Sequence, residues 1–196
     1  MALRERRVNN GMPLNEVEAI AHECANLLIV YYTYVETIKR FDPKGTRFDL
    51  LRRQIHIKVT ENDLILRLCR LDDDDTTQHS LREALRSIRN SLPQAKVTAI
   101  DRRLKKYRQL INPMKTKARN YYLAHLSKSA EVPHDRFVNF QKEVDEVINI
   151  FDMISGEAVR YVLRAGPQEL ELDLRQELLK GSQPRPRSFK SGRERR

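Results

Sequence analysis

The stretch VTAIDRRLKKYRQLINPMKTKARNYYLAH, residues 97–125, has the most regular apolar spacing in the chain. Its apolar and aromatic side chains recur at steps of three and four residues, which places them on one face of a helix. Pro113 lies inside the stretch, and a proline removes a backbone hydrogen bond, so we expect the helix to bend or restart near Asn112. The series is Val97, Ile100, Leu104, Tyr107, Ile111, Met114, Ala118, Tyr121 and His125.

Two amphipathic helices are predicted before this stretch. Residues 15–41 begin with Asn15 and Glu18, a pair that forms a capping box at a helix start. Ser80 and Glu83 repeat the pattern before a short, leucine-rich helix. The apolar positions of both segments also follow steps of three and four residues, so each helix has one face to bury.

The segment between these two helices, FDLLRRQIHIKVTENDLILRLCRL at residues 48–71, is compatible with two structures. Leu51, Ile55, Ile65 and Leu68 fit one face of a helix. The pieces IHIKV and LILRL instead alternate apolar and polar residues on either side of TEND, which fits two strands joined by a turn. The pattern alone supports helix and hairpin about equally.

The C-terminal part predicts a fifth helix, whose apolar stripe runs from Phe137 to Tyr161 and which Gly166-Pro167 ends. LELDLRQELL, residues 170–179, predicts one more short helix. These elements together predict an all-α, antiparallel bundle of four to five helices. The predicted divisions are a flexible segment at 1–13, the helical bundle at 14–165, a short C-terminal helix at 166–179 and a disordered basic tail at 180–196.

The composition predicts a soluble protein that is attracted to polyanions. Hydrophobic residues make up 40% and charged residues 33%, and no apolar run reaches the roughly 20 residues of a membrane span. The net charge is +10, of which residues 180–196 carry seven Lys or Arg and one Glu, so 7 − 1 = +6. RNA or DNA is therefore the first partner to consider, and no membrane partner is expected. Cys24 and Cys69 lack zinc-site spacing, which predicts buried, reduced thiols in a cytoplasmic protein.

The familiar nucleotide-binding and metallohydrolase motifs GxGxxG, P-loop, HExxH and GxSxG do not occur in the sequence. The acidic run Asp72–Asp75 has carboxylates that suit a hard cation, but it lacks the glycine and the distal glutamate of an EF-hand loop. We therefore expect a solvated loop before the next helix rather than a metal site. No cofactor and no metal are predicted.

Arg119, Asn120 and His125 are the candidate catalytic residues. Histidine titrates near neutral pH and can move protons, while arginine binds phosphate and can stabilise the charge that builds up on it. Asparagine can orient either group or the substrate. If the 2′-hydroxyl of RNA is the nucleophile, the protein needs to supply only positioning, proton transfer and charge.

The spacing of these residues favours a dimer. On a helix, Arg119 and His125 lie about 9 Å apart along the axis and about 120° apart around it, too far to grip one phosphate. Two copies that face each other across a symmetric dimer would bring arginines and histidines into one cleft. The alternative is that His125, which is in phase with the apolar stripe, is an ordinary histidine at a structural interface.

The piece RNYYLAH resembles the signature of the HEPN superfamily, and most closely that of the abortive-infection U-type HEPN group. The earlier pieces LILRLCRLDDDD and SLREALRSI are similar to segments of that group, so the resemblance spans roughly residues 15–160. It implies helix rather than hairpin at residues 50–71. It also implies that Arg119 stabilises the phosphate, that Asn120 is the polar residue of the site and that His125 is catalytic. One departure is Tyr121, which stands where a lysine is common.

By this resemblance the protein is expected to be a metal-independent endoribonuclease of phage defence or toxin–antitoxin type that acts as a homodimer on RNA. An antitoxin or a nucleotidyltransferase is the expected protein partner. The alternative function is a non-catalytic helical module that binds nucleic acid or such a nucleotidyltransferase.

Overall fold

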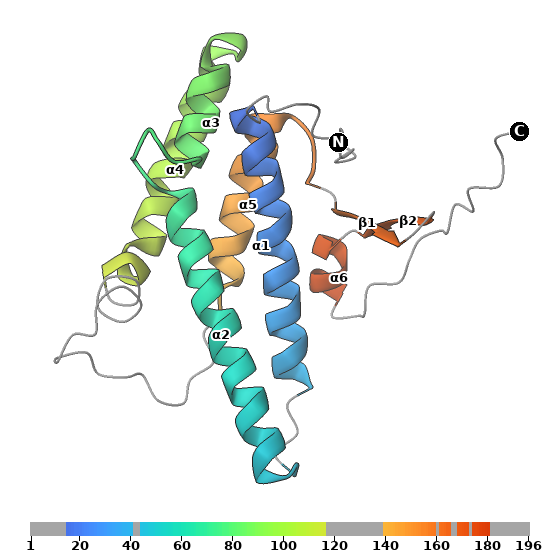
Figure 1. Ribbon diagram of the computed structural model, residues 1–196. Coiled ribbons are helices and arrows are strands. Elements are labelled where there is room, and N and C mark those ends of the chain that lie inside the picture. The colour runs from blue at the N-terminus through green and yellow to red at the C-terminus, as the bar shows by residue number, and fades with distance from the viewer. Residues whose placement is uncertain are drawn as a thin grey trace, which may run out of the picture.

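The computed structural model of the protein describes residues 15–40, 44–116, 139–159, 161–165, 168–172 and 174–180. Within these ranges the long helices α1, α2, α4 and α5 lie side by side as a bundle, which confirms the predicted all-α fold (Figure 1). The elements are α1 (Glu16–Lys39), α2 (Arg47–Leu71), α3 (Leu81–Ile88), the 3-10 turn η1 (Arg89–Ser91), α4 (Gln94–Pro113), α5 (Gln141–Ser155), β1 (Tyr161–Ala165), β2 (Gln168–Leu172) and α6 (Leu174–Lys180).

Side-chain caps fix where the first helices begin. The Asn15 side chain accepts the backbone N–H two residues further on at 2.8 Å, and α1 begins at the next residue. The Ser80 hydroxyl accepts the N–H of Glu83 at 3.3 Å and starts α3. Both starts agree with the sequence analysis. Thr46 caps α2 in the same way, at 3.2 Å. These bonds satisfy backbone donors that have no partner inside the first turn of a helix.

Residues 47–71 form one continuous helix, so the hairpin alternative for this segment is wrong. The TEND piece at residues 60–63 lies inside the helix and forms no turn. The buried positions Ile57, Leu64 and Leu68 follow the helical period and pack in the main core together with side chains of α1. A helix places these apolar residues on one face that packs against α1. This packing, rather than the local sequence pattern, decides the structure of residues 47–71.

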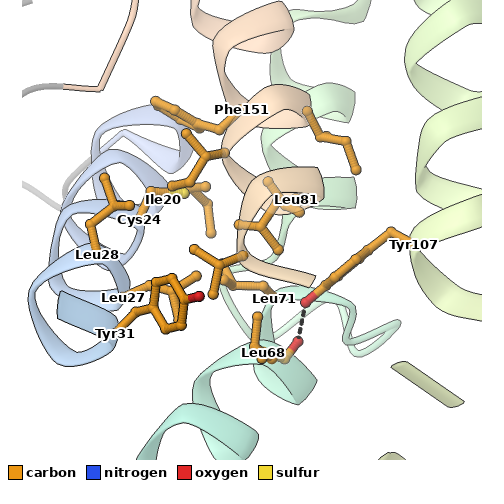
Figure 2. Close-up of a cluster of buried hydrophobic side chains, with 14 of the residues drawn as sticks. Ile20, Cys24, Leu27, Leu28, Tyr31, Leu68, Leu71, Leu81, Tyr107 and Phe151 are labelled. Atoms are coloured by element: carbon orange, nitrogen blue, oxygen red, sulfur yellow. Dashed lines mark hydrogen bonds between the residues drawn. The ribbon is translucent and has the colours of Figure 1, made fainter. Parts of the chain in front are cut away.

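The core gathers between α1, α2, α3 and α5, as Figure 2 shows for Leu27, Leu71 and Leu81 among others. Tyr107 reaches into this core from α4, and its hydroxyl donates to the carbonyl oxygen of Leu68 at 2.7 Å (Figure 2). That carbonyl is one of the last four of α2, which have no partner within the helix. Burial raises the pKa of the Tyr107 hydroxyl, so it remains a donor.

Aromatic packing and a buried thiol hold α1 against its neighbours. The rings of Tyr34 in α1 and Phe140, just before α5, meet edge to face with centroids 5.5 Å apart. Both rings are buried, so this contact fixes α1 against the start of α5. Cys24 and Cys69 are buried, as the sequence analysis expects. Burial raises the pKa of the Cys24 thiol, which keeps it protonated and unreactive.

The C-terminal part differs from the prediction of a fifth helix that continues to Gly166-Pro167. Helix α5 ends at Ser155, because Gly156 takes a left-handed conformation with φ of 76° that stops the helix. Strands β1 and β2 then pair antiparallel, with Leu163 opposite Leu170. Residues 168–172 are therefore strand where the sequence predicts helix, and among the described residues after Gly156 only α6 is helical.

Helix α6 is tied to α5 by an ion pair with two short contacts. The two terminal nitrogens of Arg175 lie 2.6 Å from the two carboxylate oxygens of Asp152. The backbone N–H of Val159 donates to the same carboxylate at 3.2 Å. Leu174 is buried in the main core beside these groups.

In the part of the chain that the structure describes, no helix is both long and apolar enough to cross a membrane.

Replacing Tyr107 by Phe should lower the free energy of unfolding by about 1 to 2 kcal/mol, because the Leu68 carbonyl loses its donor inside the core. Urea denaturation measures the change. Thr98→Ala removes an exposed hydroxyl from the same helix and serves as the control, with an expected change within about 0.5 kcal/mol. Equal effects of the two substitutions would show that the buried bond adds nothing.

Candidate functional site

The predicted catalytic residues Arg119, Asn120 and His125 lie outside the described residues, as does Tyr121. The structure therefore neither brings these side chains together nor separates them. It does describe the helix from which this segment follows, up to Thr116.

Helix α4 packs with the stripe that the sequence predicts. Val97, Ile100, Leu104, Tyr107 and Ile111 are all buried. The irregularity that the sequence predicts near Asn112 comes directly after Pro113, since α-helical geometry continues through that residue. The turn then widens into a short π-helical turn at residues 114–116, where the missing N–H of the proline disturbs the hydrogen-bond ladder.

A buried carboxylate holds this end of α4 to the bundle. Asp72, directly after α2, has a side chain with no exposed surface. Arg108 donates to its two carboxylate oxygens through Nε at 3.0 and 3.3 Å. The Lys115 ammonium lies 2.7 Å from one of these oxygens, and an Arg82 terminal nitrogen lies 3.5 Å from the other. Three cations from α3, α4 and the turn after α4 thus converge on one anion.

Two of these cations also satisfy the end of α2. The carbonyl oxygen of Asp72 accepts from Arg108 at 3.3 Å and from Lys115 at 2.8 Å. A helix C-terminus carries partial negative charge, so cations there are stabilising. We call Asp72, Asp74, Arg82, Arg108 and Lys115 the Asp72 cluster.

Asp74 closes the cluster at the surface. Its side chain is 63% exposed, and Arg108 donates to it at 2.6 Å. That hydrogen bond lowers the pKa of Asp74, and the bond to Asp74 together with those to Asp72 raises the pKa of Arg108. Three cations and two carboxylates leave the cluster with a charge of 3 − 2 = +1. These cations are used for structure, so they are poor candidates for binding RNA phosphates.

The cluster corrects the prediction of a solvated loop at residues 72–75 for Asp72, whereas Asp74 and Asp75 are exposed loop residues as predicted. Asp72 is buried and neutralised by protein cations, although Asp75 is exposed and accepts the N–H of Thr77 at 2.9 Å as a turn residue does. Among the described residues, no group of three or more His, Cys, Asp or Glu side chains could hold a metal ion. The carboxylates of the acidic run that lie near the core are occupied by guanidinium and ammonium groups.

The Asp72 cluster is not among the features predicted from the sequence, although a signal for part of it is present. Arg108 and Lys115 are seven residues apart, which is two helical turns and therefore one face of a helix. The partner Asp72 comes directly after the last leucine of α2. The pairing itself could not be predicted, because it depends on how α4 lies across the end of α2.

A comparison with families of known proteins bears on the whole bundle. The model of the HEPN_AbiU2 family, whose description is AbiU2, matches residues 14–154, which is most of the chain. The chain belongs to this family. No curated protein and no solved structure matches it. The family assignment confirms the HEPN resemblance, and the matched range contains Arg119, Asn120 and His125 as well as the Asp72 cluster.

Within this HEPN_AbiU2 domain the Asp72 cluster anchors the chain just before the predicted site. Lys115 is four residues from Arg119 in the sequence, about 6 Å if the rise is helical. The chain therefore reaches Arg119 four residues after Lys115, whose position the buried Asp72 carboxylate fixes.

Replacing Asp72 by Asn should lower the free energy of unfolding by about 2 to 4 kcal/mol. The substitution leaves Arg108 and Lys115 facing a neutral group, and their partial exposure keeps the loss near the lower part of the range for buried ion pairs. Asp74→Asn is the matched control, since Asp74 contacts the same arginine but is exposed, and it should cost less than about 1 kcal/mol. Chemical denaturation of both variants measures the difference, and equal losses would contradict the central role given to Asp72.

Proposed function

We propose that the protein is a metal-independent endoribonuclease of abortive-infection or toxin–antitoxin type. In this proposal, Arg119, Asn120 and His125 of two protomers form a composite site at a homodimer interface. The observation that carries the proposal is the match to the HEPN_AbiU2 family over residues 14–154, a range that contains these three residues. They supply the groups that RNA cleavage needs without a metal.

The proposed chemistry uses the RNA's own 2′-hydroxyl as nucleophile. His125 moves the protons, because an imidazole titrates near neutral pH. Arg119 stabilises the negative charge that develops on the phosphate, since a guanidinium binds phosphate through two hydrogen bonds. Asn120 orients one of these groups or the substrate. Two copies are needed because one copy spreads the arginine and the histidine too far along a helix.

The charge of α4 supports an RNA substrate. The helix Gln94–Pro113 carries six Lys or Arg and one Asp, so 6 − 1 = +5. Two of these cations lie beside a carboxylate, since nitrogen atoms of Arg103 and Lys106 are each 3.7 Å from an oxygen of Glu146 in α5. Arg102 and Lys105 instead lie on an exposed face, where they can meet a phosphate backbone.

This exposed face of α4 leads toward the proposed site. Its positions follow each other at steps of three and four residues, which is the spacing of one helix face. In sequence, the next such steps after Thr116 reach Arg119 and Asn120. An RNA strand bound along this face would therefore approach the proposed catalytic residues. The face consists of Arg102, Lys105, Gln109, Asn112 and Thr116, all of them exposed.

His125→Ala should lower the rate of RNA cleavage by about 100-fold or more, because the variant lacks the proton-transfer group. The assay incubates the purified full-length protein with RNA in EDTA and follows the fragments by gel electrophoresis. His22→Ala removes an exposed histidine of α1 and is the matched control, with an unchanged rate expected. Cleavage that requires a divalent metal, or that survives in His125→Ala, would contradict the mechanism.

A non-catalytic role is the second candidate function, favoured by the charge of the chain itself. The basic tail at residues 180–196 and the charge of α4 can bind nucleic acid without any reaction. In that case wild type and His125→Ala would bind RNA equally, the binding would weaken with salt, and neither protein would cut the RNA. Removal of residues 180–196 would show how much of the binding belongs to the tail.

A further inference from the structure

Helix α2 exposes an apolar surface on the side away from the core. Among the described residues, all of the large hydrophobic side chains that are exposed lie on this one helix, with 41% to 86% of their surface accessible. On the helical period they share one face, within about 80° of each other around the axis, and they extend about 27 Å along it. We call them the α2 stripe: Phe48, Leu51, Ile55, Val59 and Leu66.

The position of α2 leaves this stripe open. Buried residues of the same helix, such as Ile57 and Leu64, point to the core on the opposite side. Figure 1 shows that the ends of α1 and α2 around residues 39 and 47 extend beyond the neighbouring ends of α4 and α5. An apolar face of this length costs free energy in water, so it indicates an interaction surface.

Cations line both edges of the α2 stripe. Arg52 and Arg70 are 18 residues apart, about five full turns, so they share the edge beside Val59. Arg47 and Lys58 are eleven residues apart and lie within about 20° of each other on the other edge. The Arg52 side chain is 82% exposed. Arg47 and Arg70 are exposed too, and among the described residues no carboxylate pairs with either of them.

The carboxylates of α2 are engaged by the helix itself. Asp49 accepts from the hydroxyl of the helix cap at 2.7 Å. Glu61 lies 3.2 Å from Lys58, and Asp63 lies 3.0 Å from Arg67. The helix carries six Lys or Arg and three Asp or Glu, so 6 − 3 = +3. A partner that covers the stripe therefore gains from negative charge at its own two edges.

Asn62 indicates that the partner is a protein rather than a lipid surface. It lies between Val59 and Leu66 along the axis and within the angular range of the stripe, and it is partly exposed. Under lipid, its amide would lose hydrogen bonds to water without replacement, which costs free energy. A polar side chain on a facing helix can supply these bonds, and one polar pair in an apolar seam fixes the register of two helices.

We propose that the α2 stripe binds an amphipathic helix of another protein, whose apolar residues cover the stripe and whose two edges carry Asp or Glu. The contact extends over about five turns of each helix. A second copy of α2 fits less well, because it brings the same excess of cations to both edges. RNA also fits less well, since only one of the five side chains of the stripe is aromatic and able to stack on a base.

This contact is independent of the proposed nuclease. It requires neither RNA nor the residues Arg119, Asn120 and His125. A chain that binds the acidic helix but cuts no RNA would leave the α2 contact standing and refute the nuclease, and a nuclease that binds no such helix would do the reverse.

A library of helical hairpins displayed on yeast tests the chemistry of the partner. One helix of each hairpin carries leucine at the spacing of the stripe and either Glu or Lys at every edge position. The full-length protein should enrich hairpins with Glu at both edges. These hairpins should bind Ile55→Gln about 10-fold or more weakly than the wild type, because the contact then buries an amide in the seam. Gln54→Ala changes the neighbouring exposed position, about 100° around the helix, and should bind as the wild type does.

Charge exchange across the contact tests the edges, with circular dichroism to confirm that each variant is folded. Arg52→Glu should weaken binding of the enriched hairpins by about 10-fold, and Lys in place of Glu at the facing hairpin position should restore it. Enrichment of Lys at the edges, no enrichment, or equal binding of wild type and Ile55→Gln would overturn the proposal. Sedimentation with phosphatidylglycerol vesicles is the last arm, and vesicle binding that Ile55→Gln abolishes would assign the stripe to a lipid surface and overturn the proposal as well.

Discussion

A carboxylate without exposed surface, Asp72, is the constraint on which the arrangement of this bundle depends. An isolated charge in such a place would cost several kcal/mol, so cations have to reach it. They come from α3, from α4 and from the turn after α4, and each one brings its own element to the end of α2. The Tyr107 hydroxyl bonds to a carbonyl of the same helix end, four residues before Asp72. Charge and hydrogen bonding thus set where α4 ends, and the proposed site begins a few residues later.

This arrangement separates the cations of the protein by role. Arg82, Arg108 and Lys115 neutralise a buried anion, and Arg103 and Lys106 approach Glu146 of the neighbouring helix. The net charge of +10 therefore overstates what is available to a nucleic acid. Arg102 and Lys105 on the exposed face of α4 are the described cations best placed for a phosphate backbone. In sequence, steps of three and four residues lead from these positions to Arg119.

Much of the bundle could be predicted from the sequence, for local reasons. The caps at Asn15 and Ser80 and the stripe of α4 depend on residues close together in the chain, and all were found. The helix at 47–71 and the end of α5 at Gly156 were not settled by pattern, because packing against α1 decides the first and one glycine decides the second. The Asp72 cluster joins Asp72 to Arg108 and Lys115, which are 36 and 43 positions further along the chain. No local sequence pattern predicts contacts over such distances. The candidate residues Arg119, Asn120 and His125 came from motif and family resemblance, and the family match includes them without testing their geometry.

Hydrogen exchange of residues 108–116, the end of α4 and the turn after it, tests most directly whether the buried carboxylate positions the chain at the proposed site. The measurement compares Asp72→Asn with Asp74→Asn by mass spectrometry under conditions in which both are folded. The account predicts much faster exchange of these amides in Asp72→Asn than in Asp74→Asn. Amides in the middle of α1 are the internal reference, and any increase in their exchange should be no more than the variant's lower global stability causes. Equal exchange of residues 108–116 in the two variants would contradict it.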